Sequence, residues 1–87
     1  MERKLPIKNK LGLHARPAAL LVETASKYDA EVQVIKNGST INAKSIMGVL
    51  MLAAERGSEL IFRAKGPQEK EALDAIEKLL NDKFHEE

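Results

Sequence analysis

Alternating apolar and polar residues predict a β-strand near the start of the chain. Across residues 2–8, Leu5 and Ile7 alternate with charged residues and Pro6, a pattern typical of a strand with one buried face. Proline has no amide hydrogen to donate to a neighbouring strand, so this strand is expected at an edge of its sheet.

Three more strands are predicted further along the chain. Residues 31–36 are rich in β-branched side chains, and Asn37-Gly38 connects them to residues 39–43. This arrangement predicts a hairpin whose turn needs positive φ angles. Residues 59–65 alternate in the same way and form the fourth predicted strand.

Apolar residues at helical spacing predict two helices before the fourth strand. The first is expected to begin at Pro17 and to end near Tyr28, because proline suits the first turn of a helix. The second is expected to begin after Ser45 as its N-cap. Arg56 and Gly57 are expected to form its last turn and its C-terminal glycine.

A third helix is expected to open at Gly66-Pro67. Glu69 and Glu71 in its first turn suit the positive end of the helix dipole. Its apolar stripe consists of Ala72, Leu73, Ile76, Leu79, Leu80 and Phe84. The stripe of the first helix consists of Ala18, Leu21, Val22, Ala25 and Tyr28.

The order of these elements, β-α-β-β-α-β-α, favours a two-layer α/β sandwich. A chain of 87 residues is short enough for a single core, so we expect one domain over residues 1–87. The 44% share of hydrophobic residues and the 31% share of charged residues indicate a folded protein with a polar surface.

The composition also narrows the classes of function. The chain has no cysteine, which excludes disulfides, thiol nucleophiles and cysteine zinc sites and suits a reducing compartment. Its first residues lack the apolar segment of a signal peptide. The longest apolar run, residues 46–54, is far shorter than the roughly 18 residues that cross a bilayer. We therefore expect a cytoplasmic protein without a membrane anchor.

A histidine precedes the first predicted helix, in the segment Leu11-Gly12-Leu13-His14-Ala15-Arg16-Pro17. Free amides and the dipole at a helix N-terminus favour an anion such as phosphate, and Arg16 adds forked donors for phosphate oxygens. Gly12 permits a close approach of the backbone. A neutral imidazole is a nitrogen nucleophile, whereas a lone histidine is more often an ordinary turn residue. The combination indicates a site that handles phosphate.

Other chemistry finds little support in the sequence. No nucleotide-binding motif is present, so a phosphoryl donor has to be another protein or a small molecule. His85 is the only other histidine, and we expect neither a metal nor a cofactor. Lys8 and Lys10 are expected to raise the positive potential near His14.

Two segments resemble the signatures of one known family. Residues 12–18, GLHARPA, are similar to the active-site signature of HPr, the histidine phosphocarrier family of the bacterial phosphotransferase system. Residues 43–49, AKSIMGV, are similar to the regulatory-serine signature of the same family. The resemblance extends over essentially the whole chain.

The resemblance implies specific roles for three residues. His14 would receive a phosphoryl group on Nδ1 from the phosphohistidine of Enzyme I and pass it to a histidine of an Enzyme IIA. Arg16 would steady the phosphate, and Ser45 would be phosphorylated by an HPr kinase/phosphorylase. The family fold is an open-faced sandwich with an antiparallel sheet of order 1-4-2-3 and three helices on one face. The resemblance also implies a phosphoryl carrier that its partner enzymes phosphorylate, and not an enzyme. We expect a monomer.

The chain departs from the commonest family pattern at several positions. Leu11 replaces a small polar residue of many sugar-branch carriers, and residues 66–69 and the Phe84 tail resemble the nitrogen-branch carriers. Glu23 and Ser26 occupy positions that are basic in some members. A nitrogen-branch regulatory phosphocarrier is therefore the alternative function.

The resemblance also implies a surface where partner proteins dock. Its residues, here called the docking patch, are Ala15, Ala19, Leu20, Ile46, Met47, Leu50 and Met51. Methionine is common on surfaces that accept several partners, although Leu50 or Met51 would equally suit a core position. A small RNA-binding module is a weaker hypothesis, because an aromatic content of 3% leaves little for base stacking and the net charge is only +1.

Overall fold

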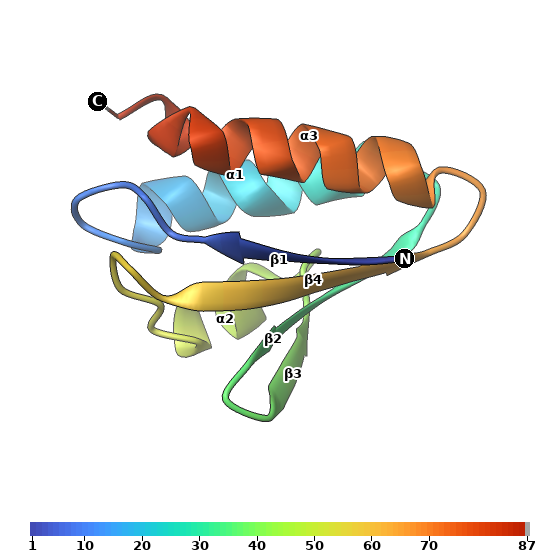
Figure 1. Cartoon of the computed structure of the whole chain (residues 1–87). Coiled ribbons are helices and arrows are strands. Elements are labelled where there is room, and N and C mark those ends of the chain that lie inside the picture. The colour runs from blue at the N-terminus through green and yellow to red at the C-terminus, as the bar shows by residue number, and fades with distance from the viewer. Residues whose placement is uncertain (87) are drawn as a thin grey trace.

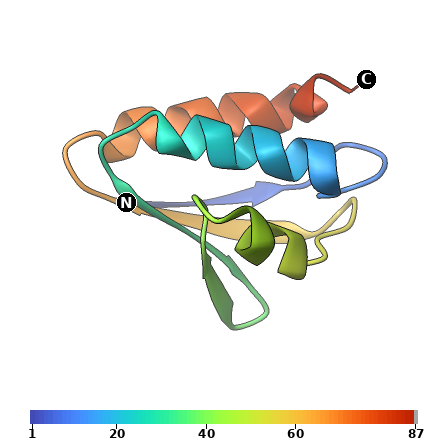
Figure 2. The same cartoon turned by 180° about the vertical axis from the view of Figure 1, so that it is seen from behind.

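The computed structural model describes residues 1–86 as one sheet with helices packed on it (Figures 1 and 2). The elements are β1 (Glu2–Pro6), α1 (Ala15–Ser26), β2 (Glu31–Lys36), β3 (Ser39–Asn42), α2 (Ile46–Met51), β4 (Glu59–Lys65), α3 (Glu69–Asn81) and a short 3₁₀ helix, η1 (Lys83–His85). None of the helices in this described part is long and apolar enough to cross a lipid bilayer.

The sheet is antiparallel and has the order β1-β4-β2-β3, which confirms the predicted topology. Pro6 lies in an edge strand, as its missing amide hydrogen requires. The turn between β2 and β3 has φ angles of 49° at Asn37 and 84° at Gly38, so the predicted hairpin is also confirmed.

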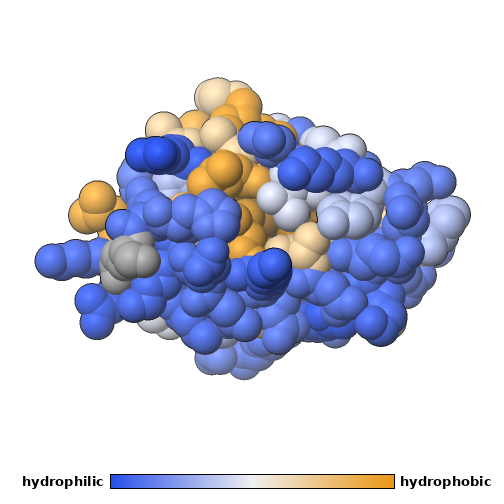
Figure 3. All heavy atoms as spheres, turned by 90° about the horizontal axis from the view of Figure 1, so that it is seen from above, coloured by the Kyte–Doolittle hydropathy of each residue, from blue (hydrophilic) through white to orange (hydrophobic). Residues whose placement is uncertain are grey.

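The helices cover one face of the sheet and leave the other face open (Figures 1 and 2). Strand β4 shows the alternation that results, because Leu60, Phe62 and Ala64 are buried whereas Glu59 and Arg63 are exposed. All six residues of the stripe predicted for the last helix are buried. Seen from above the helices, apolar surface runs from the upper edge of the view to its centre, between hydrophilic areas (Figure 3).

Several predicted helix boundaries are wrong, among them both ends of the last helix, since α3 (Glu69–Asn81) contains neither Pro67 nor Phe84. Helix α1 begins at Ala15, two residues before Pro17. The first turn of a helix tolerates a proline because the backbone amides of that turn have no helical hydrogen-bond partner. Helix α2 ends at Met51 and does not reach Gly57. Ala53 takes a left-handed φ of 49°, and the Lys36 ammonium donates to its carbonyl at 3.4 Å. The helix therefore ends just before a left-handed residue, and Lys36 of β2 binds the backbone carbonyls of residues 52 and 53.

The chain beyond α3 forms a left-handed turn. The φ angles of Lys83, Phe84 and His85 are 52°, 54° and 62°, values that residues with a Cβ seldom adopt. The Phe84 side chain is nevertheless buried in the core, so its burial holds this turn in place. The turn brings Glu86 back over the loop between β1 and α1. His85 is exposed and pairs with Asp82 through Nδ1 at 2.6 Å.

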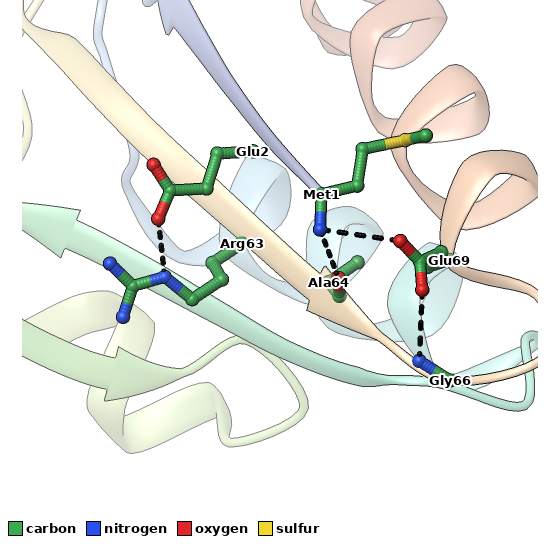
Figure 4. A network of polar contacts seen from close by, with 6 residues as sticks. All are labelled: Met1, Glu2, Arg63, Ala64, Gly66 and Glu69. Carbon is green, nitrogen blue, oxygen red and sulfur yellow. Dashed lines mark hydrogen bonds and ion pairs between the residues drawn. The ribbon is translucent and has the colours of Figure 1, made fainter.

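A polar network ties β1 to the start of α3 at the other end of the molecule (Figure 4). The Met1 amino group donates to the Ala64 carbonyl at 3.0 Å and lies 3.2 Å from the Glu69 carboxylate. The Gly66 amide donates to the same carboxylate at 3.4 Å. Hydrogen bonds from the Met1 amino group and the Gly66 amide lower the pKa of Glu69 below its usual value.

Candidate functional site

Backbone hydrogen bonds hold the loop between β1 and α1 against the segment that precedes β4. The Ile7 amide donates to the Ser58 carbonyl and the Gly57 amide donates to the Ile7 carbonyl, both at 2.8 Å. The Leu13 amide donates to the Ala54 carbonyl, also at 2.8 Å. The loop that leads into His14 therefore follows a fixed path.

Gly12 is required by this path. Its φ is 70°, and a Cβ built on it would lie 2.4 Å from the Ala54 carbonyl oxygen and 3.0 Å from the Cα of Glu55. The sequence suggests Gly12 as a point of close backbone approach in a phosphate site, but the approach that the structure shows is to residues 54 and 55 of the same chain.

His14 is the N-cap residue of α1, but it caps the helix with its backbone alone. Its φ and ψ are −85° and −169°, and its carbonyl accepts the Ala18 amide at 3.0 Å. The side chain makes no capping hydrogen bond and is 39% exposed. The interpretation of His14 as an ordinary cap therefore applies to its backbone and leaves the imidazole available for chemistry.

Asn9 and Glu86 lie on one side of the His14 ring, and sequence reasoning missed both. Asn9 is fully buried, and its amide nitrogen donates to the Gly12 carbonyl at 2.7 Å and to Oε1 of Glu86 at 2.9 Å. The other carboxylate oxygen of Glu86 is 3.0 Å from His14 Nε2. That contact lacks hydrogen-bond geometry, so Nε2 is buried without a hydrogen-bond partner in the described chain.

Arg16 is exposed in the first turn of α1. Its guanidinium forms no hydrogen bond or ion pair with any described residue, and the first turn contains no acidic residue. Its donors and the positive helix end are therefore available to an anion. Lys8 instead donates to Oδ1 of Asn81 at 2.8 Å, so its ammonium is engaged at the end of α3.

Ser45 is the N-cap of α2, as predicted. Its Oγ accepts the Gly48 amide at 3.2 Å, and the residue is half-buried. This is the ordinary role of a serine at a helix start. Its phosphorylation remains a prediction.

The residues of the docking patch lie on α1 and α2, which pack against each other. Ala15 and Ala19 are exposed, and Met47 and Met51 are 65% and 78% exposed. Ile46 is exposed, whereas Leu20 and Leu50 are half-buried against the core, so the core interpretation applies in part to Leu50. The apolar surface in Figure 3 agrees with such a patch on the helical side.

Proteins of one known family match this chain over most of its length. The family model described as "PTS HPr component phosphorylation site" matches residues 1–82. The phosphocarrier protein HPr of Treponema pallidum is 51% identical over 79 residues, which cover 91% of this chain and 90% of that protein.

Two solved structures are also similar. The crystal structure of HPr-C-His from Thermoanaerobacter tengcongensis has a TM-score of 0.96 at 47% identity and covers 100% of this chain and 98% of its own. The crystal structure of an HPr dimer from the same organism has a TM-score of 0.79 at 48% identity, with 92% of each chain covered.

The contact at Gly12 generates a stability prediction. Gly12→Ala is expected to lower the free energy of unfolding, measured by urea denaturation, because it adds left-handed strain and a clash with Ala54. Gly57→Ala is the matched control, since Gly57 has a φ of 90° but open space around it. The control should cost about 1–2 kcal/mol for strain, and Gly12→Ala about 1–3 kcal/mol more. Equal losses would contradict the close contact.

Proposed function

The chain belongs to the HPr family, and from that premise we propose that His14 is the residue that carries the phosphoryl group. The protein is a phosphocarrier of the phosphotransferase system. The observation that supports His14 is its place at the start of α1, where its backbone caps the helix and its ring makes no capping bond. The neighbouring Arg16 has its donors available to a phosphate.

We propose that the donor is the phosphohistidine of Enzyme I. The lone pair on Nδ1 of His14 attacks phosphorus, while the bond from phosphorus to the donor nitrogen breaks and its electron pair returns to that nitrogen. An Enzyme IIA histidine then takes the group from His14 by the same exchange. No bond is hydrolysed in either step, so the protein acts as a carrier.

Arg16 is proposed to hold the phosphoryl group during both exchanges. Its guanidinium carries paired N–H donors that match phosphate oxygens, and the positive end of α1 adds a favourable field. The docking patch is proposed to receive Enzyme I and Enzyme IIA in turn, because its exposed methionines adapt to different surfaces.

His14→Ala is expected to abolish phosphoryl acceptance while leaving the fold intact, because the partly exposed ring lies outside the core. The measurement is acid-labile phosphate on the protein after incubation with Enzyme I and phosphoenolpyruvate, beside a circular dichroism spectrum. Undiminished labelling of the variant would show that another residue carries the group. Comparing sugar-branch and nitrogen-branch Enzyme I as donors in this assay identifies the branch that the chain serves.

Arg16→Ala is expected to slow phosphoryl transfer to and from His14 by about tenfold to a hundredfold, the equivalent of one charge-assisted hydrogen bond. Its stability should change little, since Arg16 is exposed and has no partner among the described residues. Arg63→Ala is the control, because that arginine is likewise exposed but lies in β4, on the face of the sheet opposite the helices. Rapid-quench rates equal to those of wild type would remove Arg16 from the mechanism.

A phosphate on Ser45, placed there by an HPr kinase/phosphorylase, is expected to raise the apparent KM for Enzyme I. The modification adds about −1.5 to −2 charges at a helix N-terminus, which tolerates them, so helix content should persist. The charge would lie beside Ile46 and Met47 of the docking patch and oppose an acidic or apolar partner surface.

Both Ser45→Asp and the phosphorylated protein are compared with Ser39→Asp, which places the same charge on an exposed serine of β3. Steady-state kinetics with Enzyme I give the apparent KM. An unchanged KM for the phosphorylated protein would leave Ser45 with the role of a helix cap alone.

A further inference from the structure

We infer that Glu86, held by Asn9, is a positioning residue that keeps the proton of the His14 ring on Nε2 and leaves Nδ1 as the nucleophile. This inference rests on the proposed function of His14 and adds a positioning residue to the same site. It starts from the contact of 3.0 Å between Nε2 and the Glu86 carboxylate. The two groups lie 72 positions apart in the chain, so only the fold brings them together.

The chemistry of the two groups favours one tautomer. A neutral imidazole has one nitrogen that donates a hydrogen bond and one that accepts, whereas a carboxylate only accepts. If Nε2 carried the lone pair, that lone pair would be repelled by the negative oxygen of Glu86. If Nε2 carried the proton, the proton would be attracted to that oxygen. Nε2 is buried and has no hydrogen-bond partner among the described residues, so Glu86 is the group that decides between the tautomers.

Glu86 is itself held in position. Its Oε1 accepts the buried Asn9 amide at 2.9 Å, and the same amide nitrogen donates to the Gly12 carbonyl at 2.7 Å. Gly12 belongs to the loop whose path is fixed by the Ala54 carbonyl. The buried Phe84 anchors the chain two residues before Glu86. The carboxylate is therefore fixed from both sides, as a positioning group must be.

The same placement would assist phosphoryl transfer. When Nδ1 uses its lone pair to bond phosphorus, the ring becomes positive, because the proton stays on Nε2 while the donor nitrogen recovers its electron pair. A carboxylate at Nε2 stabilises that positive charge. The 3.0 Å contact is then expected to align into a charge-assisted hydrogen bond, since such bonds often tighten only during the reaction.

The first test is the tautomer of His14 in the unphosphorylated protein, read from its ring ¹⁵N chemical shifts by NMR. Wild type should show the Nε2-protonated form, and Glu86→Ala should shift toward a mixture of both forms. Glu71→Ala is the matched control, because it removes an exposed glutamate from the distant start of α3. Identical shifts in wild type and Glu86→Ala would overturn the inference.

The second test is the rate of phosphoryl acceptance from Enzyme I. Glu86→Ala should lower it by about tenfold, as the loss of a positioning partner typically does, with Glu71→Ala unchanged. Glu86→Asp keeps both carboxylate oxygens, one for the Asn9 amide and one for Nε2–H, so it should retain the tautomer and recover part of the rate. A Glu86→Asp protein no faster than Glu86→Ala would contradict the positioning role.

The two tests separate this inference from the proposed function. If wild type accepts no phosphate but its tautomer depends on Glu86, the function is wrong and the positioning stands. If His14 accepts phosphate and neither measurement responds to Glu86, the function stands and the positioning role is wrong.

Discussion

The contact between the β1–α1 loop and the backbone of residues 54–58 is the constraint on which the site depends. The Leu13 amide and the Ala54 carbonyl join two loops that lie 41 positions apart, and only a glycine at position 12 lets them meet at 2.8 Å. That contact sets where α1 begins, and the start of α1 sets where His14 and Arg16 lie. The positions of the residues proposed to handle phosphate therefore depend on a backbone contact between two loops.

The architecture separates the groups proposed to carry phosphate from the surface proposed to bind partners. His14 and Arg16 stand at the start of α1, whereas much of the exposed apolar surface belongs to the single short helix α2. Because Ser45 caps α2, a charge added there is proposed to act on recognition by the docking patch. A carrier that exchanges the same group with several partners is well served by this division.

Local patterns in the sequence were sufficient for much of the fold. The hairpin at Asn37-Gly38, the edge position of Pro6 and the buried stripe of α3 follow from turn chemistry and periodicity, which act over a few residues. The site is predicted only in part. His14, Arg16 and Ser45 stand in recognisable segments, but the bond between Asn9 and Glu86 spans 77 positions and leaves no local signal. The early end of α2 left no local signal either, since the carbonyl of Leu52 is bound by a lysine 16 positions earlier in the chain.

The central claim is that the phosphoryl group is carried on Nδ1 of His14, because Nε2 is buried and faces the Glu86 carboxylate. The most direct measurement is NMR of the phosphorylated, ¹⁵N-labelled protein, in which coupling between ³¹P and a ring ¹⁵N identifies the bonded nitrogen. The account predicts coupling to Nδ1 of His14. Coupling to Nε2, or a phosphate on any other residue, would contradict it.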